Sequence, residues 1–305
     1  MTRRRLLTHM DLDGATCAIL FLLIEPDAHV EFHDYNTINS AVRKHLRGGD
    51  PVLLADISPD EETLRWAAEK WPASLAIYDH HASGAWGKIH DDLPRVSGAF
   101  DSNGSGADLM HTLLEPQLAR VLDGHQVAAI DWLLEATRAR DLWQRDAEAW
   151  EDGCLLTQLV KYMGVARFVD WAVVRLRRCE LLLSPSLLQI LKAREERDAE
   201  TARDIATHAF RAMDDEGRTY YWVIASRMAS EIGHAIGEMY EDAEYAAIML
   251  PVYRSVELRS KGKVHCGDLG RSRGGGGHAD AGGYTMDLDA MPAEMARFIE
   301  QRTGL

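Results

Sequence analysis

The sequence predicts an α/β protein with an N-terminal parallel-sheet domain, a helical connector and a smaller C-terminal α/β domain. From residue 5, short apolar runs alternate with helical stretches, which is typical of a parallel sheet covered by helices. Between about 155 and 213 one helical pattern follows another, and after residue 219 strand patterns return. With 305 residues and 46% hydrophobic content, the chain is long enough to form two domains.

The first domain is expected to span residues 1–150. In chain order we expect a strand at 6–7, a helix at 15–24, strands at 30–32 and 52–55, a helix at 64–71, a strand at 75–78, and helices at 104–114 and 121–138. Pro51 and Pro72 stand just ahead of two of these strands, where a missing backbone N–H is tolerated. Asp101, Ser102 and Asn103 are N-cap candidates for the helix at 104–114.

The connector is expected at residues 151–215 and the second domain at residues 216–305. Pro185 is expected to break the helical pattern of the connector, and the charged segment 192–203 is expected to be a solvated surface. In the second domain we expect a strand at 220–225, a helix at 229–240, and strands at 245–251 and 255–258. This order predicts a smaller α/β domain.

The charge of the chain constrains its partners. The formal net charge is −14 at pH 7. Proteins that bind along nucleic acid usually carry a basic surface that neutralises many phosphates, so this charge argues against a long polymer as partner. A small phosphorylated substrate is easier to reconcile with it. The alternative is a locally basic groove on an acidic body.

Export and membrane insertion are not expected. Three arginines at 3–5 are followed by only two leucines before polar residues interrupt the apolar run. The longest apolar run, 15–24, is about half of the roughly 20 residues that a bilayer requires. Cys17, Cys154, Cys179 and Cys266 lie far apart, which disfavours a zinc ribbon or a disulfide framework. We therefore expect a cytoplasmic protein with reduced thiols and no membrane partner.

Acidic and histidine residues recur where the predicted strands end. They are His9, Asp11 and Asp13 after the first strand, Asp56 after the third, and Asp79, His80 and His81 after the fourth. Because the carboxyl ends of parallel strands line one edge of a sheet, these clusters should converge. An extended segment would send the side chains at 9, 11 and 13 to the same side. Oxygen ligands mixed with imidazole favour Mn²⁺ or Mg²⁺ over a structural zinc.

Asp56 is the expected bridge between two ions. Two ions about 3.5–4 Å apart require a shared carboxylate, and an aspartate that ends a buried strand is well placed to provide it. Each motif also has a plainer interpretation, since Asp-x-Asp pairs are common in turns and Asp56, Ser58 or Asp60 could cap the next helix. The coincidence of three clusters favours the metal site.

A glycine-rich segment lies near the C-terminus. Glycines occupy 274–277, follow Arg271 and Arg273, and precede His278. Consecutive backbone N–H groups of such a segment can form a nest for phosphate, although a bare glycine run is also typical of a flexible loop. The histidine and the arginines favour phosphate binding.

These motifs together resemble the DHH phosphoesterase superfamily. The resemblance is carried by the segment His9-Met10-Asp11-Leu12-Asp13-Gly14, by Asp56 at its strand end, by Asp79-His80-His81, and by the glycine-rich segment 275–283. It covers nearly the whole chain. It implies that residues 1–150 form the DHH catalytic domain and that residues 216–305 form the DHH-associated substrate-binding domain.

The resemblance also implies a role for each candidate residue. One ion would be bound by His9, Asp11 and Asp56, and a second by Asp13, Asp56, His80 and a further aspartate. Asp141 is the best match to that last ligand, and Asp101 is the competing candidate. Asp79 and His81 would be catalytic. Substrate binding would fall to Arg259, Gly275, Gly276, Gly277 and His278.

The implied activity is hydrolysis of short oligonucleotides, as in nano-RNases, by hydroxide that two divalent ions activate. Mn²⁺ is the preferred ion and Mg²⁺ the alternative. A nucleotide 3'-phosphatase and a cyclic mono- or dinucleotide phosphodiesterase are the alternative activities. A non-catalytic nucleotide-binding protein is disfavoured by the complete ligand set, and a pyrophosphatase by the glycine-rich segment. The partner is thus a short oligonucleotide or a small phosphorylated nucleotide, and the oligomeric state, including a homodimer, is left open.

Overall fold

The structure, a computed structural model, describes residues 5–82, 84–277 and 279–286. The chain divides into two compact units, Met1–Leu191 and Lys192–Leu305, which are described separately below. The expected functional boundaries near residues 150 and 215 stay predictions. None of the helices in the described ranges is both long and apolar enough to cross a membrane.

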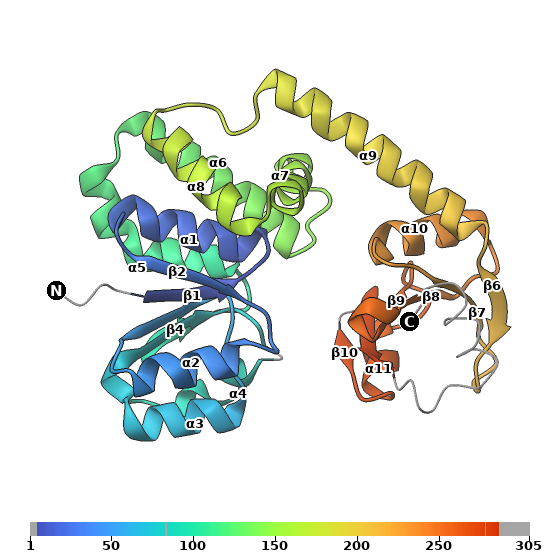
Figure 1. Cartoon of the computed structure of the whole chain (residues 1–305), viewed down its shortest axis with the longest axis horizontal. Coiled ribbons are helices and arrows are strands. Elements are labelled where there is room, and N and C mark those ends of the chain that lie inside the picture. Colours follow the sequence, from blue (N-terminus) through green and yellow to red (C-terminus); the bar gives the residue numbers. More distant parts are fainter. Residues whose placement is uncertain (1–4, 83, 278, 287–305) are drawn as a thin grey trace. The chain divides into compact units, whose positions relative to one another are not determined.

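The first unit is built on a parallel sheet of five strands with the order β2-β1-β3-β4-β5 (Figure 1). The strands are β1 (Arg5–His9), β2 (His29–His33), β3 (Val52–Ala55), β4 (Leu75–Asp79) and β5 (Ser97–Phe100). Every pairing in this sheet is parallel, as the alternating sequence pattern predicts. The strand β5 was not among the expected elements.

Helices cover both faces of this sheet (Figure 1). One face carries α1 (Leu12–Ile24), α5 (Gly106–Val121), α6 (Gly124–Asp141), α7 (Trp150–Met163) and α8 (Val165–Arg177), and the other carries α2 (Ile38–Arg47), α3 (Glu61–Lys70) and α4 (Ala85–Ile89). Successive strand residues face opposite layers, so Leu6 packs in the core with α1 and Leu7 in the core with α2. Helix α1 is buried on nearly all sides because it lies between the sheet and α5 and α8.

The helix boundaries near residue 105 and residue 122 differ from the expectation. The N-cap of α5 is Ser105, whose side chain accepts a hydrogen bond from the Asp108 N–H within a capping box. Asp101 instead accepts a hydrogen bond from the Asn103 N–H at 2.9 Å, which closes a local turn. The single helix expected at 121–138 is interrupted, because Asp123 caps the start of α6.

The second unit contains a mixed sheet with the order β10-β11-β9-β8-β7-β6. The strands are β6 (Phe210–Met213), β7 (Thr219–Ile224), β8 (Tyr245–Leu250), β9 (Ser255–Arg259), β10 (Gly276–Gly277) and β11 (Ala281–Thr285). Only β7 and β8 pair in parallel. Helix α10 (Ala229–Met239) packs on one face and α11 (Cys266–Arg271) on the other. The three strands and the helix expected here are confirmed. The helical pattern was expected to continue to about residue 213, but its last residues form the strand β6.

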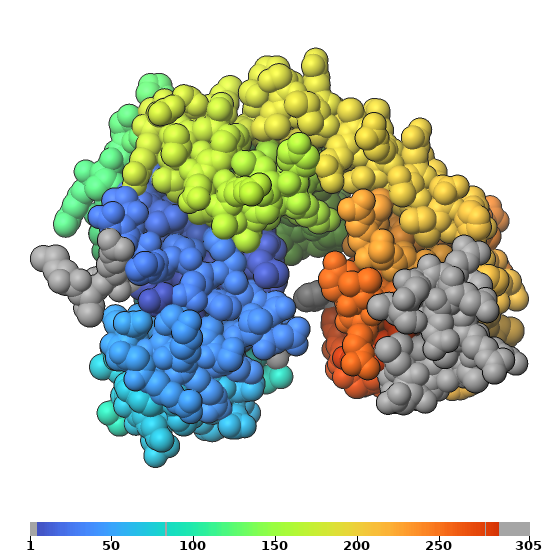
Figure 2. Space-filling view, viewed as in Figure 1, coloured from blue at the N-terminus to red at the C-terminus, as the bar shows by residue number. Residues whose placement is uncertain are grey.

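Helix α9 (Pro185–Ala206) crosses the boundary between the units. Pro185 was expected to break the helical pattern, but it is the first residue of α9. Proline is tolerated there because the N–H groups of the first helical turn have no partner within the helix. Of the charged segment expected to be solvated, residues 192–197 are exposed, whereas 198 and 199 are half-buried and Ala202 is buried in the core of the second unit. Figure 2 shows this helix in yellow at the surface. The remaining turns of 3-10 helix are Pro72–Ser74, His90–Asp92 and Pro251–Tyr253.

Candidate metal centre

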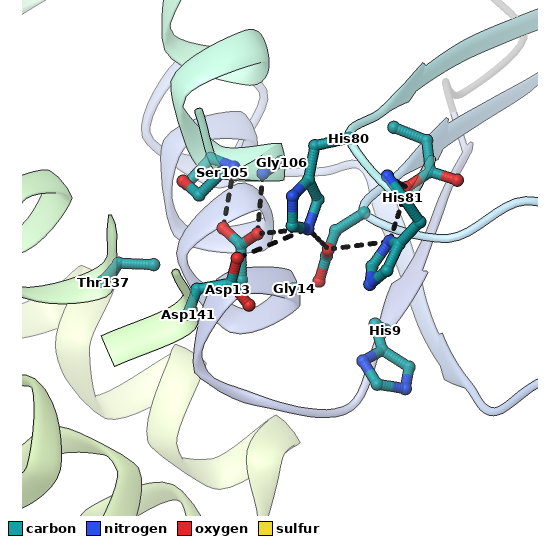
Figure 3. A network of polar contacts seen from close by, with 12 residues as sticks. His9, Asp13, Gly14, His80, His81, Ser105, Gly106, Thr137 and Asp141 are labelled. Atoms are coloured by element: carbon teal, nitrogen blue, oxygen red, sulfur yellow. Dashed lines mark hydrogen bonds and ion pairs between the residues drawn. The ribbon is translucent and has the colours of Figure 1, made fainter. Parts of the chain in front are cut away.

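The candidate ligands meet at the carboxyl edge of the first sheet (Figure 3). His9 is the last residue of β1, and Asp56 directly follows β3. His80 directly follows β4. Because β1, β3 and β4 are neighbours in the sheet, the side chains at their ends lie together. Asp141 comes from outside the sheet, as the last residue of α6.

His80 lies at the centre of the cluster. Its Nε2 is 3.2 Å from Asp56 Oδ1, 3.4 Å from Asp141 Oδ2 and 3.6 Å from Asp13 Oδ2. Figure 3 draws these contacts as dashed lines. Within the described residues, three overlapping groups have ligand atoms within 4.8 Å of one another: His9, Asp11 and Asp56; Asp13, His80 and Asp141; and Asp56, His80 and His81. The structure therefore brings together all six predicted metal ligands.

Several buried polar atoms at this point lack a hydrogen-bond partner. Among the described residues they include both carboxylate oxygens of Asp56, Oδ2 of Asp141 and Nε2 of His80. A buried polar atom without a partner costs about 1–3 kcal/mol, and more when it is charged. Bound cations would provide partners for these atoms. The mixture of carboxylate oxygen and imidazole nitrogen suits a divalent ion, so these residues could hold a metal.

Asp13 is held by the start of another helix. The N–H groups of Gly106 and Ala107 donate to the two oxygens of the Asp13 carboxylate at 2.6 Å and 2.8 Å. These are the first residues of α5, where unsatisfied N–H groups and the helix dipole favour an anion. Gly106 must be small, because a Cβ there would lie 2.6 Å from Asp56 Cβ. The helix start thus fixes one ligand and packs directly on another.

Two further contacts fix the remaining backbone. A Cβ on Gly14 would lie 2.1 Å from the carbonyl oxygen of His9, so only glycine lets α1 begin this close to the end of β1. Thr137, one turn before Asp141 in α6, shares a hydrogen bond of 2.9 Å between hydroxyl groups with Thr16 of α1. Together with the apolar packing between the two helices, this bond holds α6 against α1, and Asp141 follows in the next turn of α6.

Asp56 has an unusual backbone conformation. Its φ is 59°, in the left-handed region that most residues with a side chain avoid and that aspartate adopts more readily. Its N–H donates to the Tyr78 carbonyl at 2.9 Å, so the turn remains attached to β4. Such strain persists where the surrounding structure enforces it, and it is concentrated at functional sites. Here it directs the Asp56 carboxylate into the cluster.

The carboxylates raise one another's pKa. Burial and then the charge of Asp141 hold the pKa of Asp13 well above its ordinary value, and burial and then Asp13 do the same for the pKa of Asp56. Burial and then Asp11 raise the pKa of Asp141 to about 6. Burial and then His81 lower the pKa of His80 to about 4, so this imidazole is neutral near pH 7. At neutral pH His80 thus gives the surrounding carboxylates no compensating positive charge.

His81 and Asp79 form a pair beside the cluster. His81 Nδ1 lies 2.8 Å from Asp79 Oδ1. Burial acts to lower the pKa of His81, but the bond to Asp79 and its charge outweigh burial and raise that pKa. His81 Nδ1 is also 3.9 Å from Asp56 Oδ1. This imidazole is therefore oriented by one aspartate and lies next to the cluster, where it could hold a proton.

The predicted substrate-binding residues lie in the second unit. Arg259 ends β9, and its guanidinium donates to the Leu258 carbonyl at 2.8 Å and to Ser230 Oγ at 3.3 Å. A Cβ on Gly275 would lie 2.0 Å from the Gly283 carbonyl oxygen. The same close approach of β10 and β11 affects Gly277, where a Cβ would lie 2.4 Å from Gly282 Cα and φ is 133°.

Close packing of the backbone thus explains why residues 275 and 277 are glycines. A Cβ on Gly276 would meet nothing within 4 Å, so no such reason applies to it. His278 lies outside the described residues. Asp101, the competing ligand candidate, is exposed and closes the turn described above, so it is Asp141 that joins His80 and Asp13.

Two residues near the cluster were not expected from the sequence. The ring of Tyr35 lies 5.6 Å from the ring of His9 and 6.3 Å from the ring of His81. Tyr35 lies just after β2, which is a neighbour of β1. Its position after the end of a strand could therefore have indicated that it lies near the site. The second unexpected residue is Gly106. The segment Ser105-Gly106-Ala107-Asp108 has the pattern of a capping box, which could have marked the start of this helix.

No protein-family model matches the sequence, and no curated protein matches it either. Solved structures share its fold. A pGpG-specific phosphodiesterase from Vibrio cholerae is 15% identical, with 98% of this chain and 97% of that chain covered and a TM-score of 0.52. The DHH domain of a member of the s1p family of ribosomal proteins is 14% identical, with 99% and 87% covered and a TM-score of 0.60. The predicted fold class is confirmed.

Proposed function

We propose that this protein is a metal-dependent phosphoesterase of the DHH superfamily that hydrolyses short oligonucleotides. The observation that carries the proposal is the convergence of buried, partnerless ligand atoms of Asp56, His80 and Asp141 at the carboxyl edge of a parallel sheet. The fold shared with a DHH domain and with a phosphodiesterase supports it. Fold alone does not define an activity, so the proposal depends on the chemistry of the site.

The ligand atoms suit two ions. His9, Asp11 and Asp56 would hold the first, and Asp13, Asp56, His80 and Asp141 the second. Divalent ions bound there would polarise phosphoryl oxygens and lower the pKa of a bound water. We propose Mn²⁺, with Mg²⁺ as the alternative, because imidazole and carboxylate ligands are mixed.

His81 and Asp79 would supply the proton transfer. Asp79 accepts a hydrogen bond from Nδ1 of His81, which leaves Nε2 of the same ring for the substrate. Because Asp79 raises the pKa of His81, the ring holds a proton closer to neutral pH than an isolated histidine would. We propose that His81 donates this proton to the leaving oxygen and that Asp79 positions its ring.

The proposed substrate is short. The net charge of −14 disfavours a long polyanion, whereas a dinucleotide carries few phosphates. We propose that Arg259 and the glycines at 275–277, together with His278, bind the phosphate or the terminal nucleotide of the substrate. A nucleotide 3'-phosphatase and a cyclic mono- or dinucleotide phosphodiesterase remain the alternatives, and the named activity of the Vibrio cholerae structure makes pGpG a natural test compound. A cytoplasmic location and a homodimer remain predictions.

A substrate panel tests the proposal. Labelled oligonucleotides from dinucleotides to twenty-mers, cyclic dinucleotides and 3',5'-bisphosphonucleotides are each incubated with the protein and Mn²⁺. We expect dinucleotides to give the highest kcat/KM, and we expect chelator to abolish turnover. Equal or faster cleavage of the twenty-mer would contradict the size selectivity. No hydrolysis of any compound with Mn²⁺ or Mg²⁺ would contradict the phosphoesterase proposal itself.

A further inference from the structure

A small pocket lies beside the metal centre in the first unit. Its volume is about 250 Å³. It is lined by Tyr35, Ile38, Asn39, Ser58, Pro59, Asp60, Gly84 and Ala85. Pockets for complete small molecules typically have about 300–1,000 Å³, so this one accommodates a fragment of a ligand.

The pocket is joined to the candidate ligands through two of its walls. The Tyr35 ring contacts the rings of His9 and His81 at centroid distances of 5.6 Å and 6.3 Å. On the other wall, the Gly84 N–H donates to the His81 carbonyl at 3.0 Å. A Cβ on Gly84 would lie 3.1 Å from both that carbonyl and Ser58 Oγ. The pocket therefore lies next to His9 and His81.

The lining of the pocket is unsuited to phosphate. No lysine, arginine or histidine is among the lining residues. The Asp60 carboxylate is already used, because Oδ1 accepts from the Thr63 N–H at 2.8 Å and Oδ2 from the Asn39 amide at 2.7 Å. The Asn39 amide oxygen in turn accepts from the Asp60 N–H at 2.9 Å. The occupant should be uncharged, since a second phosphate would meet this carboxylate without a cation.

The same lining suits a flat aromatic group. The Tyr35 side chain is 51% exposed, so part of its ring is available for stacking. Ser58 Oγ is buried and interacts with the Asp79 carboxylate, whose pKa it helps to lower, so this hydroxyl is directed at Asp79. Stacking on an aromatic ring binds any nucleobase, because every base has a flat aromatic face.

We infer that this pocket is the subsite for the nucleobase of the nucleotide that carries the scissile phosphate. The inference rests on the proposed function and adds to it the part of the substrate that the first unit holds. Because Asn39 and Asp60 engage each other, few polar groups remain to read base identity. The pocket should thus bind different bases with similar affinity.

Binding of a fluorescent nucleotide tests the inference without turnover. The probe is 2-aminopurine riboside 5'-monophosphate, whose fluorescence falls on stacking, with Mg²⁺ present because Mn²⁺ itself quenches. The wild type and Tyr35→Phe should quench the probe with similar affinity. Tyr35→Ala should bind it about 5- to 150-fold more weakly, the range for loss of one base–aromatic stack. Tyr162→Ala, which removes another largely exposed tyrosine of the same unit, is the matched control and should bind normally.

A second measurement separates stacking from an effect on the metal centre. With an intact dinucleotide, Tyr35→Ala should lower kcat/KM by a similar factor. With a dinucleotide that lacks the stacked base, Tyr35→Ala and the wild type should have the same kcat/KM. Metal affinity by calorimetry should not change. Normal probe binding by Tyr35→Ala, or equal losses on both dinucleotides, would overturn the inference. If the wild type hydrolyses no nucleotide while quenching still depends on Tyr35, the subsite stands and the proposed function fails.

Discussion

Replacing Gly106 by alanine tests how closely the start of α5 is packed against the metal centre. The added Cβ would lie 2.6 Å from Asp56 Cβ, 2.9 Å from Asp56 Cα and 3.2 Å from Asp13 Oδ2. Carbon atoms in ordinary contact are about 3.5–4.0 Å apart, so α5 or Asp56 must move by roughly 1 Å. Asp56 is fixed in a left-handed conformation and bonded to Tyr78, so we expect α5 to shift and to weaken the 2.6 Å bond from the Gly106 N–H to Asp13.

Two quantities should change in Gly106→Ala. Overpacking of this kind costs about 1–3 kcal/mol of the free energy of unfolding. Loss of a partner that orients a metal ligand typically lowers metal affinity by about 10- to 100-fold, and kcat/KM should fall at least as far. Urea unfolding of the metal-free protein, calorimetric titration with Mn²⁺ and kcat/KM for a dinucleotide measure these effects.

Gly124→Ala is the matched control for this change. Gly124 is the first residue of α6, as Gly106 is of α5, but a Cβ at Gly124 would meet nothing within 4 Å. This variant should match the wild type in all three measurements. If Gly106→Ala also binds Mn²⁺ and turns over like the wild type, the close packing of α5 on Asp56 and Asp13 does not position the ligands.

Two other perturbations have expected signs. Burial and neighbouring carboxylates raise the pKa of Asp56, so its ionised form destabilises the metal-free fold as pH rises. Asp56→Asn should therefore raise the Tm of the metal-free protein at pH 7, while Mn²⁺ binding and turnover are lost. An unchanged or lower Tm would contradict the predicted charge repulsion at Asp56. For Asp108, burial acts to raise the pKa, but the hydrogen bonds from Arg138 and Ser105 and the charge of Arg138 together outweigh burial and lower that pKa. The stability advantage of the wild type over Asp108→Asn should thus be full above the ordinary carboxyl pKa of about 3.9 and disappear as pH falls through the lower folded value, which urea unfolding at a series of pH values would measure.

The strands that position the site could be predicted because each carries its own signal. The strands β1, β3 and β4 are short, largely buried apolar runs, and each ends at or directly before an acidic or histidine residue. Their parallel order brings these ends together without further information. Asp141 is different, since it ends a helix far along the chain, and only the resemblance indicated it.

The elements that were missed depend on partners distant in sequence. The strand β5 contains Gly98, and glycine is a weak strand former. A Cβ at this position would lie 1.9 Å from the Ile77 carbonyl oxygen, so the close approach of β4 requires glycine here. The strand β6 is exposed or only half-buried, and it forms because it pairs with β7. Tyr35 lies in a loop, where no periodic pattern marks a residue that faces the site.

The spread of the proposed metal ligands along the chain has a consequence for biosynthesis. The first is His9 and the last is Asp141, the final residue of α6. A ribosome adds about 5–20 residues per second and releases the N-terminal end first, so Asp13 and Asp56 leave the ribosome well before Asp141 does. Metal affinity requires the folded arrangement of ligands, which an incomplete chain does not have. The proposed second ion, which includes Asp141 among its ligands, could therefore bind only after α6 has been translated.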